Sequence, residues 1–464
     1  MTAQTYLECV DAKAILADYP MGQAFVDRYT AISRDELHAV QEARFKTVVA
    51  RAWQIPFYQR LWGAAGAEPG DIAALADLAR LPVYDKADIM ASVDAHPPFG
   101  DFAWSPADDR PPLVFHTTSG TTGKPQPILF GPRGREIQNL LAARMYMWQG
   151  LGPKDVVHSV YGHGMINGGH FIREAVIHWT RAVFMSAGTG VETRSKRQVE
   201  LMREFGATVV VGFGDYIRRL ADVARELGLE PGRDIPIRMI VGHLGTESRE
   251  TVEAAWGGQA RAFDWYGVAD TGTIAGEGPD RDGMYVWEDA QYLELLDIDS
   301  GQAVADGDTG DMVVTCLYKD DIFPIIRFNT HDVTRLRTDT NATGLAFARI
   351  TGFEGRSDNM VKIRGINIFP HGIAAMIEDV PDLTGEYICR VDRDDTGRDE
   401  MTVVIEYAGG TPARASAAHS LAHRLKETIG IAVEVDLVGP GETAALTEID
   451  RRQKPIRLID NRGL

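Results

Sequence analysis

The stretch SKRQVELMREFGATVVVGF, residues 195–213, joins an amphipathic helix to a buried strand and decides the fold class. Its first part, residues 195–206, has apolar side chains at helical spacing, Ser195 and Gln198 in the positions of a capping box, and Gly206 as a stop signal. The second part, residues 207–213, is rich in β-branched side chains and lacks polar alternation, which is typical of a buried strand.

The same alternation continues on the C-terminal side of this stretch. A helix is predicted over residues 215–228, a strand over 237–243, a helix over 248–257 and a strand over 261–267. Strands that alternate with helices in this way form a parallel sheet covered by helices. Because ligands bind at the carboxyl ends of such strands, VGHLGTE (241–247) and WYGVADTG (265–272) are candidate site segments.

The flanking regions have a different character. Residues 1–110 are predicted to be mostly helical, with a capping box from Ser33 to Glu36, and the segments after about residue 275 are short and β-like. A polar, glycine-flanked stretch at 351–365 is typical of a linker. We therefore predict an α/β protein with two domains. The large one, 1–355, would have parallel sheets covered by helices plus a β-subdomain, and the small one, 356–464, would be α+β.

Composition and charge argue against several classes of partner. The formal net charge of −18 disfavours nucleic acid and anionic membranes. No run of about eighteen apolar residues is present, and the N-terminal residues lack the pattern of a secretory signal. The cysteines, Cys9, Cys316 and Cys389, are too far apart for a zinc motif or a disulfide framework. These features predict a cytoplasmic enzyme-sized protein without a membrane or nucleic-acid partner.

The segment HTTSGTTGKPQP, residues 116–127, combines glycines, hydroxyl side chains and one lysine, a composition suited to binding phosphate. It is not a Walker A loop, because Gly120 and Gly123 are too close together and Lys124 is followed by Pro125 rather than by Ser or Thr. A Ser/Thr/Gly surface turn would have the same composition, so these residues alone leave both interpretations open.

Six motifs, in order along the chain, resemble those of the adenylate-forming enzymes, the superfamily of acyl-CoA synthetases, peptide-synthetase adenylation domains and luciferases. They are TTSGTTGKP (117–125), GTE (245–247), WYGVADTG (265–272), IIRFNTHDVTRL (325–336), GRSDNMVKIRGINIFP (355–370) and RRQKPIRLIDNR (451–462). Within that superfamily, YGHGMINGG (161–169) and RLIDNR (457–462) are similar to segments of phenylacetate–CoA ligases. The likeness to this branch extends from about residue 50 to the end.

The resemblance implies a reaction in two steps. A carboxylate attacks the α-phosphate of ATP and releases pyrophosphate, and a thiol, that of CoA, then attacks the acyl-adenylate and releases AMP. Lys454 would be catalytic, Asp270 would bind Mg²⁺, and Asp358 would be the hinge about which a mobile small domain swings. The nucleotide would be bound by Thr118, Ser119, Gly120, Thr121, Thr122, Gly123, Lys124, Gly245, Thr246, Glu247, Tyr266, Gly267, Asp332 and Arg356, with Arg327 and Arg335 as further candidates.

Asp270 departs from the motif of the family, YGxTE, because Ala269 and Asp270 replace the usual hydroxyl residue and glutamate. Aspartate can still serve Mg²⁺, which takes one or two carboxylates and completes its shell with water and phosphate oxygens. The departure therefore bears on the rate more than on the class of reaction.

The acid substrate is the least defined part of this prediction. By resemblance its pocket is lined by Tyr161, His163, Asn167, Gly168, His170, Phe213 and Gly214. The polar members predict an aromatic acid that carries a polar group, such as a hydroxy- or aminobenzoate or an aryl acetate. The leading hypothesis is thus an ATP-dependent acid–thiol ligase. One alternative passes the acyl group to a carrier protein, an amine or another nucleophile; a second is a catalytically decayed nucleotide-binding protein. The resemblance leaves a homodimer open.

Overall fold

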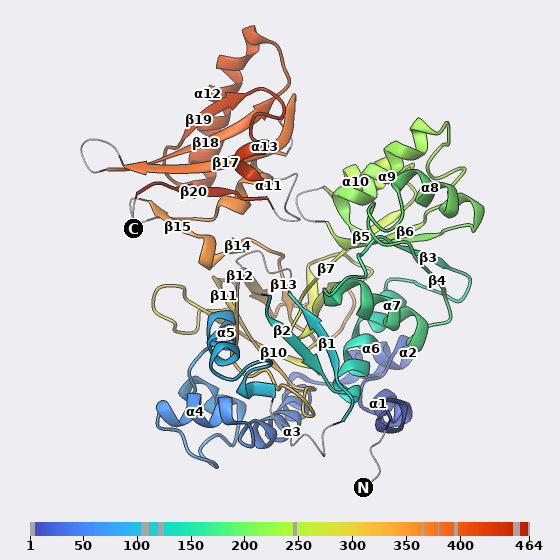
Figure 1. The fold of residues 1–464 in the computed structure, drawn as a ribbon, viewed down its shortest axis with the longest axis vertical. Coiled ribbons are helices and arrows are strands. Elements are labelled where there is room, and N and C mark those ends of the chain that lie inside the picture. The colour runs from blue at the N-terminus through green and yellow to red at the C-terminus, as the bar shows by residue number, and fades with distance from the viewer. Residues whose placement is uncertain are drawn as a thin grey trace. The chain divides into compact units, whose positions relative to one another are not determined.

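The computed structural model describes residues 5–103, 111–118, 125–244, 248–363, 366–378, 380–393, 398–448 and 455–462. By internal contacts the chain forms two compact units (Figure 1). The first unit comprises 1–330 and 335–352, and the second comprises 331–334 and 353–464. The division thus falls a few residues before the predicted domain boundary, and it assigns His331–Thr334 to the second unit as well.

Parallel strands form one half of the large sheet of the first unit, as the sequence predicts. From the outer edge inward their order is β4 (Val183–Ser186), β3 (Val156–Ser159), β5 (Val209–Phe213), β6 (Met239–His243) and β7 (Arg261–Val268). The register pairs Val210 with Ile240 and Ile240 with Ala262, so the carboxyl ends of the strands lie at one edge of the sheet.

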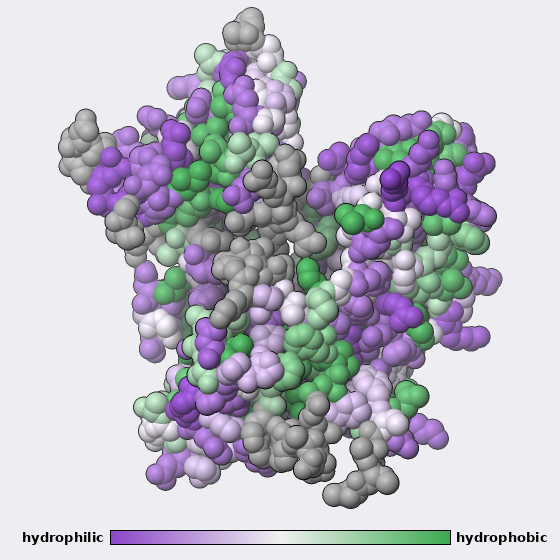
Figure 2. Space-filling model, in the orientation of Figure 1, coloured by the Kyte–Doolittle hydropathy of each residue, from purple (hydrophilic) through white to green (hydrophobic). Residues whose placement is uncertain are grey.

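Both faces of this parallel half are covered by helices. Val209 and Val211 point into a core with α6 and α7, whereas Val210 and Ile240 point into a second core with α8, α9 and α10. The helices are α6 (Pro132–Trp148), α7 (Asn167–Trp179), α8 (Ser195–Glu204), α9 (Gly214–Glu226) and α10 (Arg249–Ala255). Hydrophilic residues dominate the outer surface of α8–α10 (Figure 2).

Helix α8 ends as predicted but does not begin as predicted. Gly206 adopts a φ of 65°, and the N–H of Ala207 reaches back to the carbonyl of Met202 at 2.8 Å, which closes the helix C-terminus. The capping box at Ser195 and Gln198 is wrong. Ser195 is already the first helical residue, and the buried Gln198 amide donates instead to the carbonyls of 188, 189 and 193.

The other half of the sheet is antiparallel and begins where β7 pairs with β8. Outward from β7 the order is β8 (Gly272–Glu277), β9 (Met284–Val286), β13 (Arg349–Ile350), β12 (Phe328–Arg337), β11 (Thr309–Cys316) and β10 (Gln291–Leu296). A separate hairpin of β1 (Val114–Thr117) and β2 (Pro127–Phe130) flanks residues 119–124. The β-subdomain expected after residue 275 is therefore continuous with the parallel half.

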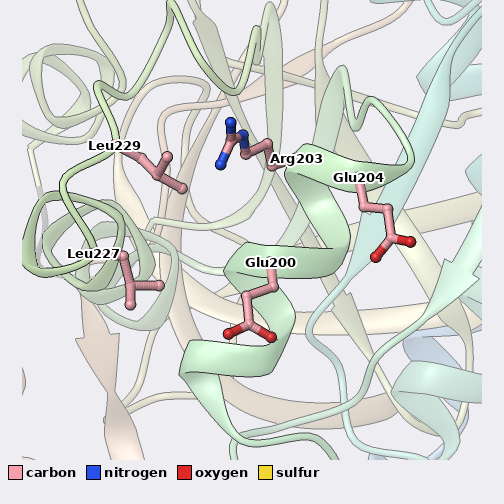
Figure 3. Close-up of a pocket in the computed structure, with 5 residues that line it drawn as sticks. All are labelled: Glu200, Arg203, Glu204, Leu227 and Leu229. Carbon is pink, nitrogen blue, oxygen red and sulfur yellow. The ribbon is translucent and has the colours of Figure 1, made fainter.

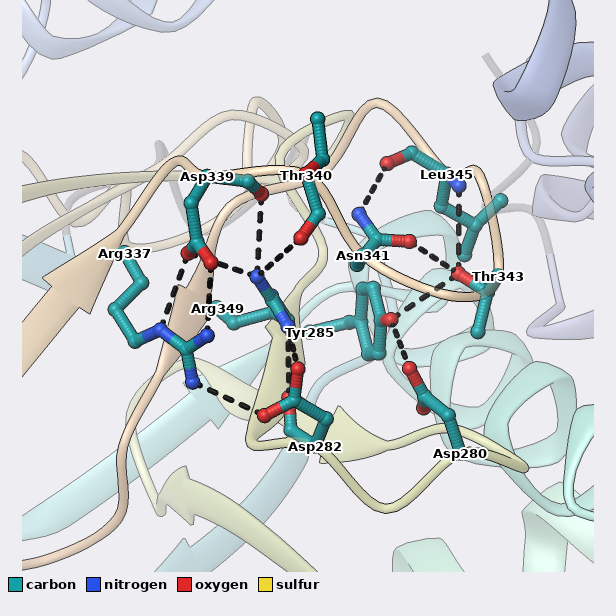
Figure 4. Close-up of polar contacts among 10 residues, drawn as sticks. All are labelled: Asp280, Asp282, Tyr285, Arg337, Asp339, Thr340, Asn341, Thr343, Leu345 and Arg349. Atoms are coloured by element: carbon teal, nitrogen blue, oxygen red, sulfur yellow. Dashed lines mark hydrogen bonds and ion pairs between the residues drawn. The ribbon is translucent and has the colours of Figure 1, made fainter.

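A polar network fastens β9, β13 and the loop that leads into β13 (Figure 4). The guanidinium of Arg349 is fully buried and pairs with Asp282 and Asp339, and Arg337 contacts the same two carboxylates. Tyr285 in β9 donates its hydroxyl proton to Asp280 at 2.6 Å. The network thus ties the ends of three interior strands of the antiparallel half to their connecting loops.

The N-terminal helices are joined to the sheet by a buried ion pair. Arg144 in α6 makes two hydrogen bonds of 2.9 Å to Asp289, and Tyr29 donates to the same carboxylate at 2.8 Å. Burial by itself raises the pKa of Asp289, but Arg144 and Arg44 hold it below its usual value. The helices of this region are α1 (Ala12–Asp18), α2 (Gly22–Ala31), α3 (Arg34–Ala52), α4 (Pro56–Ala64) and α5 (Lys86–Ala95), with 3₁₀ turns at Leu7–Cys9, Leu75–Arg80 and Asp101–Ala103. The capping box from Ser33 to Glu36 at the start of α3 is confirmed.

The second unit is built on a four-stranded sheet with its own core. The strand order is β19 (Glu434–Val438), β18 (Asp399–Tyr407), β17 (Leu383–Arg393) and β20 (Leu458–Asp460), and Leu421 and Leu425 of α12 pack onto it. The remaining elements are β14 (Gly355–Arg356), β15 (Val361–Ile363), β16 (Ile366–Ile368), α11 (Ile373–Ile377), α12 (Thr411–Ile429) and α13 (Ala444–Thr447), with 3₁₀ turns at Ser357–Asn359 and Pro370–Gly372. The unit is α+β, as predicted.

Replacing Asp289 by alanine tests the buried pair. The change leaves the Arg144 guanidinium buried without its carboxylate, and we expect the free energy of unfolding to fall by about 3–5 kcal/mol. Urea unfolding followed by tryptophan fluorescence measures the loss. The matched control is Glu226→Ala, which removes an exposed pair with Arg219 and should have little effect. Equal losses of unfolding free energy in the two variants would contradict the stabilising role of the buried Arg144–Asp289 pair.

Candidate functional site

Four aromatic side chains meet at the carboxyl ends of the parallel strands. Tyr161 follows β3, Phe213 ends β5, His243 ends β6 and Trp265 lies in β7. The ring centroids are 5.4 Å apart for Tyr161–Phe213, 5.4 Å for Phe213–His243 and 4.3 Å for His243–Trp265. Tyr161 is buried, whereas the Phe213 side chain is 49% exposed. The strand ends therefore present an aromatic wall of which Phe213 is the open part.

Glycine allows the strands behind this wall to approach closely. A Cβ on Gly242 would lie 1.7 Å from the carbonyl oxygen of Gly212, and one on Gly212 would lie 2.1 Å from Val160. The Tyr161 hydroxyl donates to the same Gly212 carbonyl at 3.3 Å and accepts from the Trp265 indole at 3.3 Å. Backbone contact and side-chain hydrogen bonds together determine the position of the wall.

A second group, polar in character, lies between β1 and the start of α7. The His170 ring is 4.9 Å from the ring of His116 and 5.6 Å from that of His163, and its Nε2 contacts the carbonyl of Gly164 at 2.7 Å. Burial is the main reason why the pKa values of His116 and His163 are lowered, that of His116 to about 4. These two rings are therefore neutral near pH 7.

Asn167, the first residue of α7, belongs to this polar group. Its Oδ1 accepts a hydrogen bond of 2.5 Å from the fully buried Arg135 guanidinium. Because a guanidinium only donates, this contact fixes the orientation of the amide and turns Nδ2 away from Arg135. Within the described residues, neither Asn167 Nδ2 nor His163 Nε2 has a hydrogen-bond partner, although both are buried. The group thus has unused hydrogen-bonding capacity beside the segment predicted to line the acid pocket.

Asp270 lies in the turn between β7 and β8 and is buried. Its Oδ1 accepts from the Gln126 amide at 2.6 Å, and its backbone carbonyl accepts from the Lys319 ammonium at 3.0 Å. Burial raises the pKa of Asp270 and lowers that of Lys319 to about 8. The carboxylate is a hard oxygen donor held in place by its neighbours, and a single such group suits an ion that keeps its other positions for phosphate and water.

Three of the predicted residues come together in the second unit. Asp332 in β12 lies opposite Arg356 in β14, and Arg356 Nη1 donates to Asp332 at 2.8 Å. The same guanidinium donates to both oxygens of Asp358, at 2.8 Å and 2.6 Å. His331 Nδ1 lies 3.1 Å from the Ser357 hydroxyl beside them. The pair predicted to hold the ribose and the predicted hinge residue are thus directly linked.

The remaining predicted residues divide into three groups. Ser119, Gly120, Thr121, Thr122, Gly123, Lys124, Gly245, Thr246, Glu247 and Lys454 lie outside the described residues. Thr118 pairs with Gln126, and Tyr266 and Gly267 lie near the end of β7. Gly168 lies in the first turn of α7, and Gly214 begins α9. Arg327 is taken up by a bidentate contact with Glu294, at 3.0 Å and 2.9 Å, which favours a structural role.

Sequence reasoning missed Arg135, Gln126 and Lys319. Gln126 was inside the segment HTTSGTTGKPQP, but nothing in that segment indicated a partner 144 residues away. Lys319 lies three residues after β11, and only its complete burial distinguishes it from a surface lysine. Each contact is long-range, so local pattern carried no signal for it.

A pocket of about 510 Å³ lies elsewhere, lined by Glu200, Arg203, Glu204, Leu227 and Leu229 (Figure 3). These residues come from the end of α8 and the segment after α9, both of which lead into the amino ends of strands. The pocket is therefore remote from the carboxyl ends where the aromatic wall lies, and its lining contains no predicted site residue.

Comparisons with known proteins identify the family. The AMP-binding enzyme family matches residues 11–316, and the AMP-binding enzyme C-terminal domain matches 365–462. The chain is 32% identical over 447 residues to a phenylacetate–coenzyme A ligase of Aromatoleum evansii, covering 91% of this chain and 96% of the relative. It is 31% identical to the enzyme of the same name from Escherichia coli (strain K12), covering 90% and 94%.

A solved structure is similar over nearly the whole chain. It is a 2-hydroxyisobutyryl-CoA ligase in the postadenylation state, with a TM-score of 0.80, 28% identity and coverage of 94% of this chain and 92% of that one. The chain belongs to the AMP-binding enzyme family, in its phenylacetate–CoA ligase-like branch. It is an AMP-forming ligase of the acyl-CoA synthetase type. Among the described helices, none is both long and apolar enough to span a bilayer.

The buried histidine in β1, His116, predicts a specific pH dependence of stability. The pKa of His116 is lowered to about 4 in the folded chain by burial, with Arg135 and His170 adding to the effect, against about 6.5 when unfolded. The unfolded chain therefore binds the proton first, and stability present above pH 6.5 is lost as the pH falls toward 4. Between pH 6.5 and 5.5, the free energy of unfolding of the wild type should fall by about 1 kcal/mol more than that of His116→Gln.

Urea unfolding at the two pH values measures this difference. The matched control is His423→Gln, which changes an exposed histidine on α12 and should keep the pH dependence of the wild type. If His116→Gln also keeps it, His116 is not held neutral in the folded chain.

Proposed function

We propose that this enzyme activates an aromatic carboxylic acid with ATP and transfers the acyl group to CoA. The observation that carries the proposal is the placement of the aromatic wall and the Asp270 turn at the carboxyl ends of one parallel sheet, in a chain of this family. An acid bound against the wall and a triphosphate beside Asp270 would approach each other at that edge. The two solved states of the structural relative, postadenylation and thioesterification with CoA, support a reaction in two half-steps.

In the first half-reaction the protein aligns two anions and neutralises their charge. The acid carboxylate attacks the α-phosphorus, the bond to the β-phosphate oxygen breaks, and pyrophosphate leaves. Residues 118–124 and 245–247 would hold the phosphates and the adenine beside Tyr266 and Gly267. Asp332 would accept hydrogen bonds from the ribose hydroxyls, with Arg356 supporting it. Mg²⁺, which neutralises phosphate charge, would be held by Asp270 and the nucleotide.

Lys454 would bridge the carboxylate and the α-phosphate as negative charge moves between them. An ammonium is a compact, mobile charge, which suits this task. In the proposed domain arrangement Lys454 belongs to a small domain, 356–464, which turns about Asp358 relative to the large domain, 1–355. The contact of Asp358 with Arg356 supports this role, because a change in one would alter the ribose-binding pair. Such gating by domain motion separates adenylation from thiol transfer.

The polar group beside α7 indicates the class of acid. An apolar ring would pack on Phe213 and Tyr161, whereas Asn167 Nδ2 and His163 Nε2 could bond to a polar substituent. We infer a hydroxy- or aminobenzoate or an aryl acetate with such a substituent. Among the relatives, one is named for an aromatic acid, phenylacetate, and another for a hydroxylated acid, 2-hydroxyisobutyrate.

Replacing Lys454 by alanine tests the catalytic assignment. Acid-dependent exchange of labelled pyrophosphate into ATP reports adenylation alone, whatever the acceptor is. We expect the exchange to fall by about 10²–10³-fold, because one group that stabilises transition-state charge is lost, with ATP binding retained. The matched control is Lys426→Ala, on the exposed side of α12, which should exchange as the wild type does. Near-normal exchange in Lys454→Ala would refute its role.

A panel of acids in the same assay separates the proposed function from its alternatives. Exchange with aromatic acids, followed by AMP release that depends on CoA, supports the ligase. AMP release that is independent of CoA points to a carrier protein, an amine or another acceptor. No exchange with any acid in the wild type would favour a nucleotide-binding protein that has lost catalysis.

The polar pocket makes a further prediction about specificity. His163→Phe and Asn167→Ala should lower kcat/KM for a hydroxylated aromatic acid about tenfold relative to phenylacetate, because a hydrogen bond to the substituent is lost. The comparison uses both acids with each variant, and His423→Phe serves as the exposed histidine control. An unchanged ratio of kcat/KM values would remove these residues from the acid pocket.

A further inference from the structure

The turn that carries Asp270 is held at its backbone by side chains from the antiparallel half. Lys319 donates to the carbonyl of Asp270 at 3.0 Å, and the Tyr318 hydroxyl and the Gln291 amide donate to the carbonyl of Thr271 at 2.7 Å and 3.1 Å. Tyr318, Lys319 and Gln291 are completely buried. The Lys319 ammonium also lies over the rings of Phe130 and Phe323, at 4.2 Å and 4.7 Å. All of these hydrogen bonds go to backbone carbonyls, so they hold the backbone of the turn rather than the Asp270 carboxylate.

The carboxylate itself is contacted by Gln126. The distance from Gln126 Nε2 to Asp270 Oδ1 is 2.6 Å, and the two residues are 1% and 4% exposed. Rotation about the last side-chain bond of aspartate is soft, so this short hydrogen bond can select its orientation. An amide nitrogen can only donate, which matches an ionised carboxylate.

Gln126 is itself fixed by the strand pair that flanks residues 119–124. Its N–H donates to the Thr118 hydroxyl at 3.1 Å, and its carbonyl accepts from the Thr118 N–H at 3.1 Å. The next pair in the register is Thr117 with Pro127. Gln126 therefore joins the base of the predicted phosphate segment to the predicted Mg²⁺ ligand.

We propose that Gln126 is a positioning residue for Mg·ATP, which orients the Asp270 carboxylate toward the ion that the nucleotide carries. This proposal rests on the proposed role of Asp270. Gln126 acts through Asp270 and contacts neither the acid nor the acceptor. Loss of its amide should therefore weaken the binding of Mg·ATP and leave the binding of metal-free nucleotide, the acid and CoA unchanged.

Isothermal titration calorimetry with the non-reacting analogue α,β-methylene ATP tests this without turnover. We expect Gln126→Met to bind the analogue about tenfold more weakly than wild type in saturating Mg²⁺, and equally well in EDTA. Gln126→Glu, which has the same shape but places an acceptor against Asp270, should lose more in Mg²⁺. Gln149→Met is the matched control, because Gln149 is a buried glutamine that donates to the Glu277 carbonyl at 2.9 Å in another part of the unit.

A double-mutant cycle tests whether Gln126 acts through Asp270. In Mg²⁺, Gln126→Met added to Asp270→Asn should cause no further loss, because the carboxylate that it orients is gone. A loss of the same size in EDTA as in Mg²⁺, a loss of the same size in Gln149→Met, or additive losses in the cycle would each overturn the proposal. Thermal unfolding of each variant without ligand shows whether it folds. If Gln126→Met fails to fold, Gln126→Glu provides the second test.

The result is separable from the fate of the proposed function. If wild type binds the analogue with Mg²⁺ but no acid supports pyrophosphate exchange, the proposed reaction fails while Gln126 is still tested by calorimetry. In another outcome, pyrophosphate exchange occurs and binding of the analogue by Asp270→Asn no longer depends on Mg²⁺, whereas binding by Gln126→Met still does. The proposed reaction then stands, and the role of Gln126 is refuted.

Discussion

The strand β7 has one parallel and one antiparallel neighbour, and the arrangement of the candidate site depends on this pairing. It runs parallel to β6 and antiparallel to β8, with an irregular register between Tyr266 and Gly267. Parallel pairing brings its end beside the ends of β5 and β6, where the aromatic wall lies. Antiparallel pairing makes the chain reverse at once, so Asp270 remains at the same edge. Gly267 permits the reversal, because a Cβ there would lie 2.4 Å from the Gly272 carbonyl oxygen.

Burial makes the polar groups at this edge depend on one another. A buried polar group is costly unless it is hydrogen-bonded, so a matching partner stabilises such a group. Lys319 has the Asp270 carbonyl, Asp270 has the Gln126 amide, and Arg135 has Asn167 and Glu174. These contacts restrict orientation, and orientation is what a reaction between two anions requires. The same burial lowers the pKa of Lys319 to about 8.

Local sequence pattern predicted the helix ends well where the hydrogen-bonding partners are close in the sequence. The capping box at Ser33 and the stop at Gly206 use groups within a few residues, and both are present. The capping box at Ser195 had the right residue types but failed, because buried carbonyls nearby compete for the Gln198 amide. Gln126 and Lys319 could not be placed from the sequence, since their partners lie 144 and 49 residues away. The roles of residues 119–124, 245–247 and Lys454 still rest on the motifs alone.

The sequence by itself determined the class of fold and the family, because strand and helix periods and the order of motifs are written in the local chain. It also contained Asp270, Asp332, Arg356 and Asp358 as candidates. Only the tertiary structure decided which of them meet. It brought Asp332 and Asp358 to one guanidinium, and it set Gln126 against Asp270. Such contacts depend on strand register and on the cost of burying unpaired polar groups, and both are properties of the packed chain rather than of any segment.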